Sequence, residues 1–331
     1  MSRQKMVESE KKLRNIARIL ERYDISPSRV LSIKIMKSGM ENEVIRVTLS
    51  DGHVIVRRHL KNSLSGVEFE CAILDRIVGK FEKITTPHLR RTIDGKAYCM
   101  YQGEIFTVYN YLSGSPVSES SPRLIAEVCD FATRFQQVTS LFQWPTTNQW
   151  PSISQTQDLA LQFTRENREA FTDQEMNFLH ARIDDLSMLR SVLDRFPIVV
   201  VHGDLHGGNL LTDFSGDLNA VLDFDDAFMG SSILEFAGIV RGHCFDDCCR
   251  LLPEQCNNVY LQAGASTKKN CSLIEFYKII DFTCLKYLLH AYFMGRCKNP
   301  SPRIFNQLLY SQQVDFQKWV GHRHEELKFR F

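Results

Sequence analysis

Excess charge of either sign is absent from this chain, whose 331 residues include 40 Lys and Arg against 39 Asp and Glu, for a formal net charge of +1. Proteins that bind nucleic acids through the phosphates are usually strongly basic, so we expect no nucleic-acid partner. Apolar runs of the roughly 20 residues that a membrane-spanning helix needs are also absent, and residues 1–10 are polar and charged, unlike a signal peptide. We therefore expect a cytoplasmic protein without a membrane partner.

Two common nucleotide-binding motifs are missing. The pattern G-x-x-x-x-G-K-[ST] does not occur, which excludes a P-loop, and no G-x-G-x-x-G follows an expected strand. Internal repeats and low-complexity tracts are absent as well. The chain is long enough for about two domains of roughly 150 residues, each with its own apolar core.

Cysteine is plentiful, with ten residues, and in a protein without an export signal these are most simply reduced thiols. One group combines the residue types that bind zinc: His243, Cys244, Cys248, Cys249 and Cys256. No C-x-x-C pair occurs among them, and the run is typical of a helix with cysteines on several faces. A structural zinc site is therefore the less favoured interpretation.

The most informative stretch is IVVVHGDLHGGNLLTDFSGDLNAVLDFDDA at residues 198–227. Two short apolar runs, at 198–201 and 220–222, each end in a cluster of His, Asp or Asn. We interpret them as a β-hairpin-like unit whose strand ends present carboxylates at one edge. Such carboxylates repel one another unless a cation or a basic group neutralises them. The four are Asp204, Asp223, Asp225 and Asp226.

The spacing in this stretch indicates phosphoryl transfer. From His202 the pattern runs H-x-D-x-x-x-x-N, which contains Asp204 and Asn209, and Asp223 follows inside a D-F-D. A phosphoryl-transfer site needs a carboxylate to accept the hydroxyl proton, and an Asn and an Asp to hold Mg²⁺ against the nucleotide phosphates. The order of residues here supplies these groups.

HGDLHGGN followed by LDFDDA resembles the catalytic segment of the aminoglycoside phosphotransferase and choline kinase superfamily. It is most similar to homoserine kinase type II and related small-molecule kinases, and to a bacterial stress-response protein kinase. The resemblance implies a two-lobe, protein-kinase-like fold in which Asp204 is the catalytic base and Asn209 and Asp223 are Mg²⁺ ligands. Asp225 stands where protein kinases have the Gly of D-F-G, and either a second metal or a structural role would explain it.

Upstream, the pattern predicts an amphipathic helix at 11–21 and antiparallel strands at 30–36, 43–49 and 53–60. The connection between the first two strands falls where a kinase places its phosphate-covering loop. The segment GMENEVIRV resembles that loop of homoserine kinase type II. The resemblance implies that Gly39 and Asn42 bind the nucleotide phosphates.

The third strand contains VIVR, a pattern in which kinases place a basic residue facing the α and β phosphates, here Arg57. In a regular strand Arg58 points to the other face. A helix predicted at 66–80 carries Glu70 on its inner side, where it can pair with Arg57, with Glu68 as the second choice. The alternatives are an exposed strand arginine and a solvated helix glutamate.

Further strands are predicted at 89–93, 97–101 and 104–111. VYNYLSG resembles the hinge between the two lobes of the superfamily, which implies that Asn110 and Leu112 contact the nucleotide base.

Helical periodicity dominates beyond Gly114. Helices are predicted at 123–139, 158–195, 273–297 and 303–320, with an aromatic loop at 144–151. We therefore predict an α+β, two-lobe fold, with a nucleotide-binding lobe at 1–112 and a mostly helical catalytic and substrate-binding lobe at 113–331.

The segment GSSILEFA matches the superfamily's Gly followed by Asp-hydrophobic-Ala, except that Glu235 stands where Asp is usual. We expect the hydrogen bond from this position to the catalytic loop to be adjusted, not lost. His202 is expected to brace the same loop.

The favoured function is an ATP- or GTP- and Mg²⁺-dependent kinase acting on a small-molecule hydroxyl, such as an amino alcohol, a hydroxy amino acid or an aminoglycoside, as a monomer or homodimer. A protein Ser/Thr kinase is the first alternative, although no A-P-E follows the D-F-D. The second is a metallohydrolase using His202, Asp204 and His206, against which the surrounding glycines argue.

Overall fold

The computed structural model describes residues 14–38, 42–60, 63–144, 153–170, 172–246, 250–267, 269 and 271–293. The chain divides into two compact units. The first comprises Met1–Gly114 with Ala220–Asp225, and the second Ser115–Asn219 with Asp226–Phe331. Within the residues described, no helix combines the length and the apolar character needed to cross a membrane.

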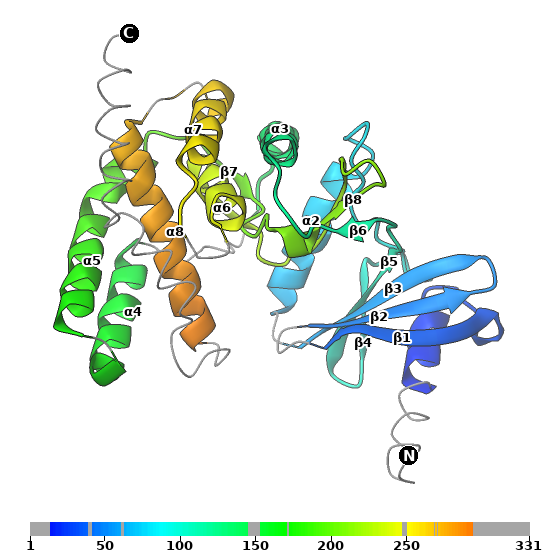
Figure 1. Ribbon diagram of the computed structural model, residues 1–331. Coiled ribbons are helices and arrows are strands. Elements are labelled where there is room, and N and C mark those ends of the chain that lie inside the picture. The colour runs from blue at the N-terminus through cyan, green and yellow to red at the C-terminus, as the bar shows by residue number, and fades with distance from the viewer. Residues whose placement is uncertain are drawn as a thin grey trace. The chain divides into compact units, whose positions relative to one another are not determined.

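The first unit contains a five-stranded antiparallel sheet in the order β1-β2-β3-β5-β4 (Figure 1). A helical segment at 14–21 and the 3-10 turn η1 (Pro27–Arg29) precede it. Its elements are β1 (Val30–Ser38), β2 (Asn42–Leu49), β3 (Gly52–His59), α2 (Leu64–Ile77), β4 (Tyr98–Tyr101) and β5 (Glu104–Asn110). The side chain of Ser63 caps α2 by accepting a hydrogen bond from Gly66 N at 3.2 Å.

Alternation along the strands gives this sheet two different faces. One face packs into an apolar core with the helical segment at 14–21, and its members include Ile45, Val47, Val54 and Val56. The other face carries Arg57, which lies directly opposite Val44 of β2. The pleat therefore separates the core of the unit from the face that carries the arginine.

The strand predicted at 89–93 does not form. Only Leu89 makes an isolated bridge, to Tyr109, and the segment otherwise runs without regular structure. Residues 98–101 form β4, which pairs with residues 104–107 of β5, while residues 88–90 make two backbone hydrogen bonds to the end of β5. The helix predicted at 66–80 is α2, which begins two residues earlier and ends at Ile77.

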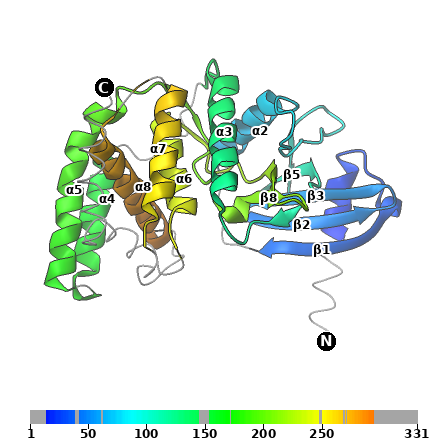
Figure 2. The ribbon, with the colours of Figure 1, turned by 45° about the horizontal axis from the view of Figure 1, so that its top comes forward.

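The second unit is mostly helical (Figures 1 and 2). Its helices are α3 (Pro122–Thr139), α4 (Ile153–Glu166), α5 (Asp173–Leu193), α6 (Ile233–His243), α7 (Pro253–Thr267) and α8 (Leu273–Phe293). Its short strands are β6 (Ser115–Pro116), β7 (Ile198–Val201), β8 (Leu210–Thr212) and β10 (Phe228–Ser231), with 3-10 turns η2 (Arg168–Ala170) and η3 (Gly207–Asn209). Helices α4 and α5 lie side by side, and α8 packs against α4, α5 and α6.

The hairpin-like pairing predicted for residues 198–201 and 220–222 is wrong. Strand β7 pairs antiparallel with β10, with Val201 opposite Phe228. The second run belongs to β9 (Leu218–Val221), in a sheet ordered β6-β8-β9. The partner strand FMGS has no apolar run that would mark it in the sequence. Its pairing depends on tertiary contacts, which local propensity does not report.

The helical region predicted at 158–195 is divided into α4 and α5 by η2. The Asn167 side chain donates to the carbonyl of Phe163 at 2.9 Å and terminates the first of these helices. The helix predicted at 273–297 is α8, which is described as far as Phe293. The helix predicted at 303–320 and most of the aromatic loop lie outside the described residues.

Candidate active site

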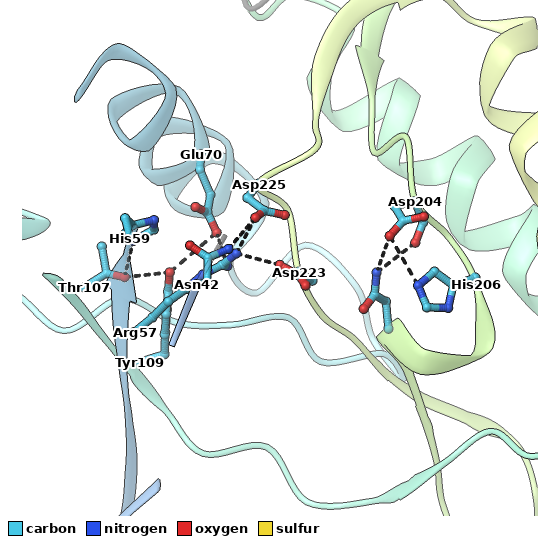
Figure 3. Close-up of polar contacts among 11 residues, drawn as sticks. Asn42, Arg57, His59, Glu70, Thr107, Tyr109, Asp204, His206, Asp223 and Asp225 are labelled. Atoms are coloured by element: carbon cyan, nitrogen blue, oxygen red, sulfur yellow. Dashed lines mark hydrogen bonds and ion pairs between the residues drawn. The ribbon is translucent and has the colours of Figure 1, made fainter. Parts of the chain in front are cut away.

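Arg57 of β3 is buried and is held by a glutamate of α2. Its Nη1 atom lies 3.0 Å from Glu70 Oε1, and the two side chains are 7% and 3% exposed (Figure 3). The expected ion pair is therefore present. The second choice, Glu68, instead accepts a hydrogen bond from the Tyr98 hydroxyl at 2.8 Å. Arg58 points away, as the strand period requires, and pairs with Glu104.

Two further carboxylates of the same unit contact Arg57 (Figure 3). Its Nη2 atom lies 2.7 Å from Asp223 Oδ1 and 2.6 Å from Asp225 Oδ2. Asn42, at the start of β2, donates to Asp225 Oδ2 at 2.6 Å. Asp223 has φ +63°, a left-handed conformation that non-glycine residues rarely adopt and that is concentrated at functional sites.

Three carboxylates face this guanidinium. Burial raises the pKa of Glu70 to about 7, although Arg57 opposes the shift. Two buried oxygens, Glu70 Oε2 and Asn42 Oδ1, accept no hydrogen bond from the described residues. Carboxylate and amide oxygens are the ligand types of a hard divalent cation such as Mg²⁺, and in this structure the carboxylates pair with Arg57.

A buried polar chain continues behind Glu70. The Tyr109 hydroxyl lies 3.5 Å from Glu70 Oε1 and accepts from the Thr107 hydroxyl at 2.8 Å, which in turn lies 2.9 Å from His59 Nε2 (Figure 3). Burial and the nearby charge of Arg57 lower the pKa of His59 to about 3, so this imidazole is neutral. These hydrogen bonds from residues of the sheet hold the Glu70 carboxylate in place.

The residues expected at the nucleotide base lie at the end of β5. Asn110 N donates to the carbonyl of His88 at 3.1 Å, and Asn110 Oδ1 accepts from Arg90 Nε at 3.2 Å. Leu112, two residues further on, is half-buried, and its N–H makes no hydrogen bond to the described residues. Gly39 lies outside the described residues.

In the second unit, the segment after β7 forms a tight loop. Gly203 has φ +83°, and a Cβ there would lie 2.8 Å from the carbonyl oxygen of Asp226, so the position requires glycine. His202 is fully buried, and its Nδ1 atom accepts from Asp204 N at 3.3 Å. The expected bracing by His202 is thus visible as a contact within the loop.

Asp204 follows this glycine, and four donor groups contact its carboxylate, three of them through hydrogen bonds. Oδ1 accepts from Arg241 Nη2 and from the Tyr287 hydroxyl, both at 2.9 Å. Oδ2 accepts from Asn209 Nδ2 at 3.0 Å and faces His206 Nε2 at 3.2 Å (Figure 3). Burial opposes ionisation of this group, but the His206 bond and the Arg241 charge hold the pKa of Asp204 well below its ordinary value.

Asn209 is oriented by the same carboxylate. Its Nδ2 atom donates to both Asp204 O and Asp204 Oδ2 at 3.0 Å, so its amide oxygen takes no part in these bonds. An amide oxygen is a suitable Mg²⁺ ligand. The residue chosen from the motif therefore presents the correct atom type.

Glu235, where Asp is usual, reaches the loop from α6. Its carboxylate accepts from His202 N at 2.5 Å and from Gly203 N at 3.3 Å. The longer side chain keeps the hydrogen bonding, as expected. Burial raises the pKa of Glu235 to about 7, against the effect of the two N–H donors.

Arg241 and Tyr287 were not identified from the sequence. Arg241 could have been suspected, because it is, with Glu235, one of two charged residues in the mainly apolar helix ILEFAGIVRGH. Tyr287 lies in α8 among many apolar and aromatic residues, and no local pattern distinguishes it.

The two metal alternatives lack a ligand cluster. Among the residues described, no group of three or more His, Cys, Asp or Glu side chains could hold a metal ion, and these residues include His202, Asp204 and His206. His243 is occupied by hydrogen bonds to Ser120 and to the Leu205 carbonyl. Cys244 and Cys256 are buried free thiols, and Cys248 and Cys249 lie outside the described residues.

Comparisons with known proteins agree with this chemistry. The phosphotransferase enzyme family matches residues 32–266. No curated protein sequence matches the chain with statistical significance.

Several solved structures share the fold. An aminoglycoside phosphotransferase from Alicyclobacillus acidocaldarius is 14% identical with a TM-score of 0.65, over 94% of this chain and 96% of that one. An aminopropanol kinase associated with a microcompartment is 16% identical with a TM-score of 0.59, over 86% and 99%. A spectinomycin phosphotransferase in complex with ADP and spectinomycin is 11% identical with a TM-score of 0.58, over 91% and 94%.

Proposed function

Because this chain belongs to the phosphotransferase enzyme family, we propose that it transfers the γ-phosphoryl group of ATP or GTP to a hydroxyl of a small molecule, with Mg²⁺ as the metal ion. The observation that carries the proposal is the buried Arg57, held by Glu70 and facing the carboxylates of Asp223 and Asp225. A phosphate-binding cation and metal-binding oxygens within one cluster are the parts that phosphoryl transfer needs.

In this proposal the cluster changes partners when the nucleotide binds. Asp223 and Asn209 would hold Mg²⁺, which would supply charge neutralisation for the phosphates. Arg57 then turns its Nη2 donors from Asp223 to the phosphates, while Nη1 stays on Glu70 at 3.0 Å. The Asn42 bond to Asp225 at 2.6 Å ties the start of β2 to the same segment, which supports a positioning role for both residues.

The base of the nucleotide is proposed to dock after β5. The Leu112 N–H makes no hydrogen bond to the described residues, and the carbonyl of Asn110 lies two residues before it. One donor and one acceptor at this spacing suit the edge of a purine. Gly39 is proposed as a phosphate contact on the resemblance alone.

Asp204 is proposed to receive the acceptor hydroxyl. Because its pKa lies below the ordinary range, it orients the hydroxyl as a carboxylate and takes the proton only as the new bond forms. Most of the rate acceleration then comes from positioning and from charge neutralisation. The proposed acceptors are an amino alcohol, a hydroxy amino acid or an aminoglycoside.

The test is Mg²⁺-dependent consumption of ATP and GTP with a panel of acceptors: choline, 1-amino-2-propanol, homoserine, spectinomycin, kanamycin and casein. We expect transfer to at least one small molecule and its loss in Asp204→Asn, which preserves side-chain shape. Asp185→Asn is the matched control, because Asp185 pairs with Lys278. Transfer to casein alone would favour the protein kinase alternative, and transfer that survives in Asp204→Asn would refute the role of Asp204.

A further inference from the structure

Each oxygen of the Asp204 carboxylate is contacted by two donor groups, so an acceptor hydroxyl has no open oxygen to approach. A carboxylate offers about four lone-pair sites, and the structure fills them with two donors on each oxygen. Arg241 and Tyr287 hold Oδ1, while Asn209 and His206 hold Oδ2. A substrate hydroxyl must therefore replace one of these four donors.

The two donors on Oδ1 are rigidly placed. Arg241 comes from α6 and its side chain is 14% exposed. Its guanidinium carbon lies 3.3 Å from the ring centre of Tyr287, so the two side chains stack. The single O–H of Tyr287 is shared between Asp204 Oδ1 and the carbonyl oxygen of Gly203. Displacing either donor would break the stack and uncover a buried charge.

The two donors on Oδ2 differ in accessibility. Asn209 is buried and is held by a second bond, to the backbone oxygen of Asp204 at 3.0 Å. The His206 side chain is 40% exposed, and its contact with Oδ2, at 3.2 Å, is the longest of the four. Its Nδ1 atom accepts from Gly208 N at 2.9 Å, so Nε2 is the nitrogen left to donate to Asp204. His206 is the donor that can leave at the lowest cost.

We propose that Arg241 and Tyr287 are positioning residues that clamp Asp204 through Oδ1, and that the acceptor hydroxyl binds at Oδ2 in the place of the His206 N–H. This inference rests on the proposed function. In the transfer, the acceptor oxygen bonds to the γ-phosphorus as the bond to the nucleoside diphosphate oxygen breaks. The diphosphate leaves with that electron pair, and the hydroxyl proton passes to Oδ2.

Steady-state kinetics separate the two roles, using the panel acceptor with the highest kcat/KM. Tyr287→Phe and Arg241→Met release the carboxylate, so kcat should fall about 10- to 100-fold while the KM of the acceptor stays within about threefold. Arg241→Lys retains a cation and should recover part of the lost kcat.

His206 is tested by a pair of substitutions. His206→Asn keeps an acceptor for Gly208 N but removes the donor to Asp204, so the acceptor should compete more easily and its KM should fall about twofold or more. His206→Gln can keep the donor and should lie closer to wild type. An acceptor KM that rises in His206→Asn would overturn the exchange at Oδ2.

Two substitutions of the same chemistry in the same unit serve as controls. Tyr260→Phe removes a hydroxyl that donates to the Cys271 carbonyl at 2.7 Å, and Arg195→Met removes an ion pair with Glu275 at 2.7 Å. The affinity for ADP, measured by calorimetry, should be within about twofold of wild type in every variant. Clamp variants with wild-type kcat, or with kcat no lower than the controls, would overturn the proposal.

The outcomes also distinguish this inference from the proposed function. If wild type transfers phosphate and the clamp variants do not differ from it, the clamp is wrong and the proposed function stands. If no acceptor of the panel is phosphorylated, the Tyr287 and Arg241 variants are compared with wild type by their rate of ATP hydrolysis, in which water is the acceptor. A wild-type protein that neither transfers nor hydrolyses refutes both proposals.

Discussion

Glu235 should make the stability of the second unit fall as pH rises from about 4.5 to 7. Its side chain is 1% exposed, and burial raises its pKa from the ordinary 4.5 to about 7. The folded state thus binds this proton more tightly than the unfolded state does. The contribution is most favourable below the unfolded pKa and is lost as pH rises through the folded pKa.

The size of the effect follows from the shift. A difference of about 2.5 pKa units at 1.36 kcal/mol per unit corresponds to roughly 3 kcal/mol across this pH window. The two N–H donors from His202 and Gly203 act in the opposite direction, and their effect is already included in the pKa of about 7.

The measurement is guanidinium unfolding of wild type and Glu235→Gln between pH 4 and 8. The three tryptophans, at positions 144, 150 and 319, all fall in the sequence ranges of the second unit, so fluorescence follows its unfolding. The difference in unfolding free energy between wild type and variant should decrease as pH rises. The contributions of the other titrating groups are the same in both proteins and cancel in this difference.

Glu275→Gln is the control of opposite sign. Although burial opposes it, hydrogen bonding from Ser272 and the Arg195 ion pair lower the pKa of Glu275. Its stabilising contribution is present above the unfolded pKa and is lost as pH falls. A flat or rising difference for Glu235→Gln would refute the assignment of its raised pKa to burial.

Two further substitutions test the packing around the site. Arg57→Met leaves three carboxylates without the guanidinium that faces them, so the unfolding free energy of the first unit should fall by about 3–5 kcal/mol. Hydrogen exchange of the β3 amides measures this, and exchange as slow as in wild type would contradict it. Gly242→Ala places a Cβ 2.8 Å from the Leu205 carbonyl oxygen, whereas Gly238→Ala on the same helix meets nothing within 4 Å. Gly242→Ala should lower the unfolding free energy by about 1–3 kcal/mol and should lower kcat. Equal melting temperatures for the two variants would show that α6 does not pack closely against the loop.

The sequence predicted the parts of the fold that depend on local patterns. Strand period placed Arg57 and Arg58 on opposite faces, and helix period placed Glu70 on the side facing Arg57. The pairing of β7 with β10 was missed, because an antiparallel partner is selected by tertiary packing and FMGS carries no strand signal of its own.

The same distinction applies to the candidate site. Asp204 and Asn209 occur in one short motif, so their contact could be anticipated from spacing. Arg241 and Tyr287 reach Asp204 from helices 37 and 83 residues away along the chain, and no local rule brings such residues together. Glu235 bonds to the same loop from α6 through His202 N and Gly203 N, and it was anticipated only because the resemblance supplied it.

The first unit includes Ala220–Asp225, which the chain reaches only after more than a hundred residues of the second. Val221 N donates to the Thr85 carbonyl at 3.1 Å, and Asp223 and Asp225 supply two of the carboxylates on Arg57. During synthesis on the ribosome, this unit therefore stays incomplete until Asp225 has emerged. A fragment truncated at Gly114 would present a buried arginine short of two counterions, so the first unit is a poor candidate for separate expression or for exchange between proteins.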